Sequence, residues 1–194
     1  MKKTKLYSLV ASAILGAVGF VLMAIELSVP IMPVFIKLDF SELPALIASF
    51  AYGPVYGVAV CFIKNALHLF ITNTAGVGEL ANFLMGAFFV VPAGLIYNKF
   101  KSRKGALIGS LVGAAVMGVA CVFINYFITY PIYYAILMPE KVILSLYQAI
   151  LPSVDSILKS LLIFNLPFTF VKGILVSIIC FVTYKKLSPI LKKQ

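Results

Sequence analysis

Charged residues are scarce in this sequence, and tryptophan is absent from it. Only 11% of the 194 residues are charged, whereas 62% are hydrophobic. Soluble domains carry about 25% charged residues, so the composition excludes a soluble catalytic domain. The mean hydropathy of +1.09 and the long apolar runs are typical of transmembrane helices, which need roughly 20 apolar residues each. We expect residues 1–194 to form a single transmembrane domain.

Patterns that bind metals or nucleotides are also missing. The chain has one His and six acidic residues, and it contains no GxxxxGK[ST], HExxH or GxSxG motif. Its cysteines, Cys61, Cys121 and Cys180, are isolated within apolar runs and form no CxxC pair, which indicates core packing rather than a disulfide or a metal site. We expect no catalytic residue, metal or cofactor, so any movement of a solute would need an ion gradient or a partner protein.

Basic residues give a net charge of +10 and gather in three clusters beside apolar runs. Such clusters indicate cytoplasmic anchors that contact anionic lipid rather than a nucleic-acid surface. All three lie in the cytoplasm only if the chain crosses the membrane an even number of times between the first two. The run 42–70 must therefore cross twice, with a break near Gly53-Pro54. The prediction is an all-α protein with six transmembrane helices and both termini cytoplasmic. The clusters are Lys2, Lys3 and Lys5; Lys99, Lys101, Arg103 and Lys104; and Lys185, Lys186, Lys192 and Lys193.

The segments between the spans are expected to lie outside the cell. Prolines make 28–41 an ordered loop, and 129–159 reads as a cap that contains an interfacial helix near 140–151. The second helix, 42–51, would span only about 15 Å. The first helix, 6–27, carries Ala13 and Ala17, a small-xxx-small pair that suits close helix packing, either within the chain or against a partner. Gly105, Gly109 and Gly113 predict a second close-packing face.

Polar side chains from four predicted helices meet at one level in the outer half of the membrane. Ionisable groups at membrane depth are costly, which favours a functional site, although Lys64 and His68 could instead reach the headgroups from a helix end. The inner half is mostly small and apolar, so we expect a pocket open to the outside and closed beneath. The candidate ligand-binding residues are Asp39, Lys64, Asn65, His68, Glu79, Asn82, Asn125, Asn165, Thr169 and Lys172.

The chemistry of this pocket suits a neutral, partly aromatic solute with many hydrogen-bonding groups. Amides, hydroxyls and amines supply donors and acceptors, and Phe123, Tyr126 and Phe127 are expected to supply flat apolar surface. The pattern does not exclude an anionic ligand, because this layer of the predicted pocket contains two basic side chains, Lys64 and Lys172, and one acidic side chain, Glu79.

Four segments carry a resemblance to a known family: KLDFSELPALI at 37–47, GPVYGVAVCFIKNALHLF at 53–70, GELANFLMGAFFVVPAGLIY at 78–97 and LPFTFVKG at 166–173. The chain resembles the substrate-binding S components of energy-coupling factor (ECF) vitamin transporters, most closely the riboflavin-specific ones. The resemblance implies six helices in a bacterial cell membrane, extracellular capture of riboflavin, and delivery with a transmembrane T component and two ABC ATPases. FMN stays open as a ligand.

The resemblance also implies roles for particular residues. Asn125 and Lys172 match positions that hold the flavin ring, whereas Thr169 stands where asparagine is expected, and Asn165 lies one turn earlier. The loop with Asp39 would cover the ligand. Ala13 and Ala17 match the motif that docks on the T component. Two alternatives are an S component for another vitamin or precursor, and a small membrane enzyme or scaffold with Glu79, His68 and Lys64 as acid–base groups.

Overall fold

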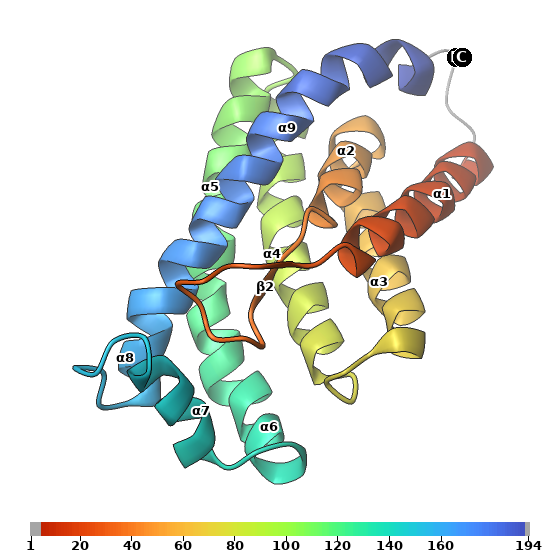
Figure 1. Ribbon diagram of the computed structural model, residues 1–194. Helices are drawn as coiled ribbons and strands as arrows, with labels where there is room; N and C mark the ends of the chain where they lie inside the picture. Colours follow the sequence, from red (N-terminus) through yellow and green to blue (C-terminus); the bar gives the residue numbers. More distant parts are fainter. Residues whose placement is uncertain (1–4, 193–194) are drawn as a thin grey trace.

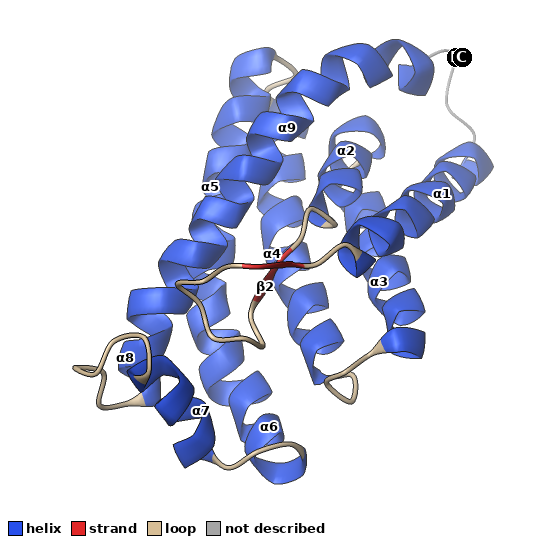
Figure 2. Cartoon of the chain, in the orientation of Figure 1, coloured by secondary structure: helices blue, strands red, loops and turns tan. Residues whose placement is uncertain are grey.

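Helices form almost all of the chain in the computed structural model, which describes residues 5–192 and their side chains up to residue 183 (Figure 1, Figure 2). Lys2, Lys3 and Lys193 of the basic clusters lie outside the described residues. Two short strands, β1 (Leu27–Ser28) and β2 (Lys37–Leu38), pair antiparallel within the first loop. The helices are α1 (Lys5–Ala24), α2 (Glu42–Tyr52), α3 (Pro54–His68), α4 (Val77–Lys99), α5 (Arg103–Ile124), α6 (Tyr130–Ile136), α7 (Glu140–Gln148), α8 (Ile157–Ser160) and α9 (Leu166–Lys192).

Among the described residues, five helical segments are long and apolar enough to cross a membrane: Lys5–Ala24, Pro54–Ile71, Val77–Lys99, Arg103–Ile136 and Ile157–Thr183. The second of them includes a 3₁₀ turn, η1 (Leu69–Ile71), at the end of α3. The predicted sixth segment is α2, which has only 11 residues. The chain is thus a multi-pass membrane protein that is almost entirely helical, while six crossings and cytoplasmic termini stay predictions.

The predicted break at Gly53-Pro54 is confirmed. Gly53 separates α2 from α3 with φ 112°, a left-handed conformation that glycine adopts without steric cost. Pro54 opens α3, where its missing N–H leaves no intrahelical hydrogen bond unmade. The chain therefore reverses abruptly, and α2 packs against α3 and α4.

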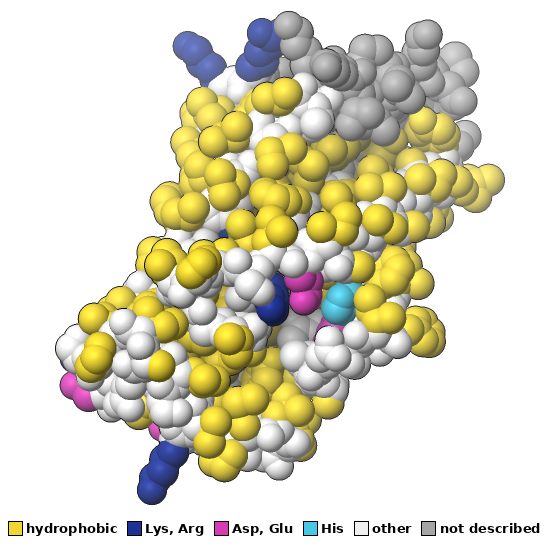
Figure 3. Space-filling view, in the orientation of Figure 1, with side chains coloured by type: hydrophobic (Ala, Val, Ile, Leu, Met, Phe, Trp, Pro, Cys, Tyr) yellow, Lys and Arg dark blue, Asp and Glu magenta, His cyan; other side chains and the backbone are white. Residues whose placement is uncertain are grey.

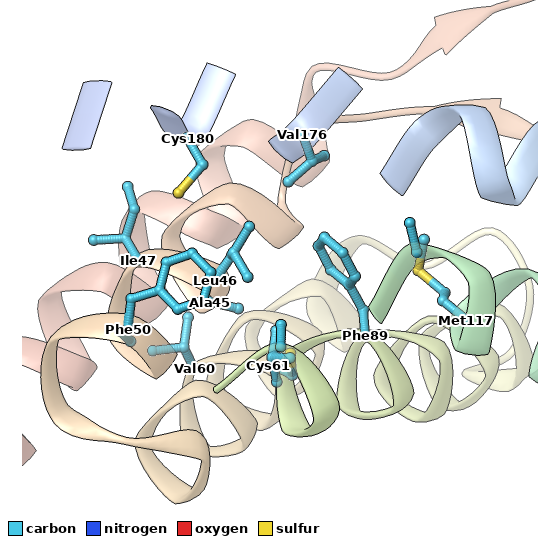
Figure 4. Close-up of a cluster of buried hydrophobic side chains, with 14 of the residues drawn as sticks. Ala45, Leu46, Ile47, Phe50, Val60, Cys61, Phe89, Met117, Val176 and Cys180 are labelled. Atoms are coloured by element: carbon cyan, nitrogen blue, oxygen red, sulfur yellow. The ribbon is translucent and has the colours of Figure 1, made fainter. Parts of the chain in front are cut away.

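The glycine face predicted on α5 packs against α4. A Cβ atom at Gly109 would lie 2.7 Å from the Ala93 carbonyl oxygen, and one at Gly113 would lie 2.5 Å from that of Phe89. Real side-chain atoms do not approach that closely, so only glycine permits this helix spacing. The buried core then continues through Leu46, Phe89, Met117 and Val176, which come from α2, α4, α5 and α9 (Figure 4).

Two π-turns interrupt the long helices in the described part of the chain, and each ends two residues before a proline. η2 (Asn125–Thr129) joins α5 to α6, and η3 (Leu161–Asn165) joins α8 to α9. Pro131 and Pro167 follow them, and because proline lacks an N–H and crowds the preceding turn, a wider turn lets the helix continue. Residues 129–136 are consequently helical, not part of an external cap as predicted; the cap is shorter and carries α7.

One end of the molecule gathers the chain segments that hold the basic clusters. Figure 1 shows the start of α1, the α4–α5 turn and the end of α9 at this end, with α6 and α7 at the other. This arrangement is the one that the positive-inside rule requires if that end faces the cytoplasm.

Cysteine labelling in intact cells tests this orientation. Ser153→Cys, in the exposed loop after α7, should react with a membrane-impermeant maleimide, whereas Lys101→Cys, in the α4–α5 turn, should react only after permeabilisation. The native cysteines are at most 1% exposed, so the unchanged protein is the background control. Labelling of Lys101→Cys in intact cells would contradict the predicted orientation.

Candidate functional site

A cavity of about 340 Å³ lies between the first loop and helices α4, α5, α6 and α9. Figure 3 shows acidic, basic and histidine side chains gathered at a hollow within largely apolar surface. Eight of the ten predicted ligand-binding residues line this cavity: Asp39, His68, Glu79, Asn82, Asn125, Asn165, Thr169 and Lys172. The helices therefore bring together polar residues that lie more than 130 positions apart in the chain.

Lys64 and Asn65 are not among the lining residues, although both are buried. The Lys64 amine is fully shielded and donates hydrogen bonds to Glu42 Oε1 at 3.0 Å, to Asn82 Oδ1 at 2.6 Å, and to the Ser41 hydroxyl. Asn65 donates from Nδ2 to the carbonyl of Cys61 at 2.8 Å. Lys64 thus supports the wall of the cavity from behind rather than facing a ligand.

Glu42 joins the two buried lysines. Its Oε1 is bonded to Lys64, and its Oε2 lies 3.0 Å from Lys172 Nζ. Lys172 also pairs with Asp39 Oδ2 at 2.8 Å. The cluster of Asp39, Glu42, Lys64 and Lys172 has two carboxylates and two amines, so its formal charge is zero. Breaking such a buried pair on one side leaves an uncompensated charge and costs about 3–5 kcal/mol.

The charge state of Asp39 follows from this cluster. Burial alone would raise the pKa of its carboxyl, but the attraction of Lys172 and Lys64 outweighs burial and lowers the pKa from 3.8 to about 2. Asp39 also accepts the backbone N–H of Ser41 at 2.9 Å. Because the folded pKa lies below the ordinary one, this stabilisation is complete above pH ~4 and is lost as the pH falls towards 2.

A second pair, His68 and Glu79, also lines the cavity. His68 Nδ1 is 2.7 Å from Glu79 Oε1, and Glu79 Oε2 accepts the hydroxyls of Thr72 at 2.9 Å and Thr74 at 3.0 Å. Both carboxylate oxygens therefore have partners, and the pair ties the end of α3 to the start of α4. These bonds give His68 and Glu79 a structural role in the cavity wall. Their presence is therefore explained without assigning them acid–base chemistry.

The third wall combines asparagines with aromatic rings. Tyr147 donates to Asn165 Oδ1 at 2.6 Å and lies 2.5 Å from the hydroxyl of Tyr130, which accepts from Asn165 Nδ2 at 3.4 Å. Burial raises the pKa of Tyr147, so it stays a protonated donor. This closed triangle ties the cap helix α7 to α6 and to η3. Phe35 of the first loop packs on Tyr130 and Tyr147 at ring distances of 6.1–6.4 Å.

Thr169 and Asn125 meet at a thiol. Asn125 Nδ2 donates to Cys121 Sγ at 3.1 Å, and the Thr169 hydroxyl donates to the same sulfur at 3.2 Å. A thiol is a weak acceptor, so both side chains keep much of their hydrogen-bonding capacity for a ligand. Cys121 itself is buried, as its apolar surroundings predicted.

Several features of the site were missed or misplaced by sequence reasoning. The aromatic surface of the cavity comes from Phe35, Tyr130, Tyr133 and Phe168. The prediction that Phe123, Tyr126 and Phe127 line it is wrong, because all three are exposed on the outside of α5 and η2. Phe123 continues the exposed face of α5 that carries Val119, and Phe127 lies within the π-turn η2. Tyr130 and Tyr133 are buried. Glu42 was recognised only as a helix start.

Comparison with known proteins agrees with this architecture. The family model described as "ECF transporter, substrate-specific component" matches residues 7–184. The chain belongs to the substrate-specific (S) components of ECF transporters. A solved structure titled "Structure and mechanism of the S component of a bacterial ECF transporter" superposes with a TM-score of 0.76 at 31% identity, covering 98% of this chain and 100% of that one.

Two curated relatives of this S component cover nearly its whole length. The riboflavin transporter FmnP of Bacillus subtilis is 35% identical over 98% of this chain and 96% of its own. The riboflavin transporter RibU of Staphylococcus aureus is 33% identical over 95% of this chain and 92% of its own. The predicted family and fold class are therefore confirmed.

Removal of the Lys172 amine should destabilise the S component through its two carboxylate partners. We expect Lys172→Met to lower the unfolding free energy by about 3–5 kcal/mol and to lower the unfolding temperature in detergent. Asp39→Asn combined with Lys172→Met should lose less than the sum of the two single changes, since one charge of each sign is then removed. Additive losses would show that Asp39 and Lys172 are not coupled.

Proposed function

We propose that this S component binds riboflavin in the cavity from the extracellular side and delivers it to the cytoplasm together with a T component and two ABC ATPases. The observation that carries the proposal is the lining of the cavity, in which aromatic rings of the first loop and α6 lie beside the amides of Asn125 and Asn165. Such a lining offers flat apolar contact and in-plane hydrogen bonds to a heteroaromatic ring. The names of the relatives FmnP and RibU support the same ligand.

The size of the cavity supports a small-molecule ligand as well. Its volume of about 340 Å³ falls within the range of roughly 300–1,000 Å³ that is usual for such sites. Phe35 and Asp39 belong to the first loop and line the cavity, so the proposed ligand would be enclosed by the loop on one side and by helices on the others.

The charges around the cavity favour a neutral ligand over an anionic one. Lys172, the buried amine on the wall, is already paired with both Asp39 and Glu42. Four carboxylates line the cavity, those of Glu26, Asp39, Glu42 and Glu79, against the amines of Lys37 and Lys172. A phosphate monoester carries a charge of about −2 and would meet more negative than positive groups here.

Titration of the purified protein in detergent tests the ligand. Riboflavin should bind with quenching of its fluorescence, and FMN should bind about tenfold or more weakly, a difference of ~1.4 kcal/mol. A protein that leaves riboflavin fluorescence unchanged would contradict riboflavin as the ligand. Equal affinity for FMN would contradict the charge argument alone.

The face of α1 that carries Ala13 and Ala17 is proposed as the docking surface for the T component. Both alanines are exposed, whereas Gly16 and Gly19 face inward. A Cβ atom at Gly16 would lie 2.5 Å from Ile63 Cγ2 of α3. The internal contact of α1 therefore uses the glycines, which leaves the small alanine pair available for close approach by a partner helix.

Enlarging this pair separates docking from binding. In cells with the complete transporter, Ala13→Leu combined with Ala17→Leu should abolish riboflavin uptake, while the isolated protein keeps its riboflavin affinity because the alanines lie far from the cavity. Val112→Leu, a change on the exposed face of α5, is the control and should leave uptake intact. Normal uptake by the double variant would rule out this docking face.

A further inference from the structure

Thr129, the last residue of the π-turn η2, has a buried hydroxyl without a hydrogen-bond partner. The side chain lines the cavity and the residue is 4% exposed, yet its Oγ1 atom is shielded from solvent and meets no donor or acceptor among the described residues. A buried polar group left unpaired costs about 1–3 kcal/mol, so such a group calls for an explanation.

Several hydroxyls elsewhere in these helices solve the same problem in one way. Five serine and threonine hydroxyls of the described helices donate to the backbone carbonyl four residues earlier, at 2.7–2.9 Å, which is a usual arrangement for these residues within a helix. The residues that do so are Ser12, Ser110, Ser160, Ser177 and Thr183.

The π-turn explains why Thr129 differs from them. The carbonyl four residues before it is that of Asn125, and this carbonyl accepts the backbone N–H of Tyr130, the bond that closes the wide turn. Pro131 lies two residues after Thr129, and the wide turn accommodates its ring, which would crowd the preceding turn of a regular helix. In the wide turn the Asn125 carbonyl is therefore aimed at an N–H one residue further along the chain than in a regular helix, and the Thr129 hydroxyl does not meet it.

We propose that Thr129 is a ligand-binding residue, whose hydroxyl forms a hydrogen bond with a carbonyl, hydroxyl or ring nitrogen of the bound solute. The inference rests on the proposed function of the cavity and adds a specificity-determining residue to it. Rotation about the Cα–Cβ bond moves the threonine hydroxyl to another staggered position, which is enough to turn Oγ1 towards a ligand.

Asn125 belongs to the same polar edge of the cavity. It lies at the first position of η2 and is four residues from Thr129, so the two side chains share a helix face. Its amide is bonded only to the weak acceptor Cys121 Sγ among the described residues. Together Asn125 and Thr129 can offer a solute two neighbouring hydrogen-bonding groups from a single turn.

Replacement by valine, which has nearly the same shape, separates this role from a structural one. We expect Thr129→Val to raise the riboflavin Kd in detergent about three- to tenfold, the usual effect of one hydrogen bond, and Thr129→Ser to stay near the unchanged protein. Without ligand, Thr129→Val should unfold at the same or a higher temperature, because an unpaired buried hydroxyl has been removed. Thr183→Val, whose hydroxyl bonds to its own helix, is the matched control and should leave the Kd unchanged.

Weaker riboflavin binding together with an unchanged or higher unfolding temperature of the ligand-free variant is expected only if the hydroxyl serves the ligand. An unchanged Kd, or a raised Kd together with a lower unfolding temperature of the ligand-free variant, would overturn the assignment. If the unchanged protein does not bind riboflavin, the proposed function fails on its own. The ligand-free unfolding temperature still decides on Thr129, since a lowered value for Thr129→Val would show that its hydroxyl has a structural partner.

Discussion

Glu42 forms ion pairs with the two buried amines of Lys64 and Lys172, and most of the site depends on these two contacts. A lysine at membrane depth is tolerated only when its charge is compensated, and Glu42 compensates Lys64 on one side and Lys172 on the other. Because Glu42 is the first residue of α2, the start of that helix must lie at the level of the cavity. The short length of α2 and the insertion of the first loop into the molecule therefore follow from the position of the ion pairs around Glu42.

The first loop can enter the molecule because protein surrounds it. Irregular backbone at membrane depth occurs only where it is buried in protein or lines a cavity. Here Asp39 pairs with Lys172, Phe35 packs on Tyr130 and Tyr147, and β1 pairs with β2. The loop contacts the ion cluster on one side and the tyrosines on the other. These contacts make it the natural cover of the cavity in the proposed uptake cycle.

Two prolines, Pro131 and Pro167, influence the part of the cavity wall that contains Asn125 and Asn165. Pro131 and Pro167 each accompany a π-turn, and π-turns often occur at functional sites. Each turn includes one cavity-lining asparagine, Asn125 or Asn165. The first turn also leaves the Thr129 hydroxyl without a backbone partner. The same local adjustment that lets the helix continue past a proline thus places polar groups on the cavity wall.

The amino-acid sequence alone determined the class of the protein, the break at Gly53, the glycine face of α5 and the convergence of most polar site residues, because these follow from hydropathy, backbone preference and helix periodicity. Only the tertiary structure decided that Lys64 turns away from the cavity and that Glu42 pairs with it. Periodicity gives the spacing of side chains along a helix but not which neighbouring helix they meet. For the same reason the exposure of Phe127, which lies within a π-turn, was not predictable from the residues alone.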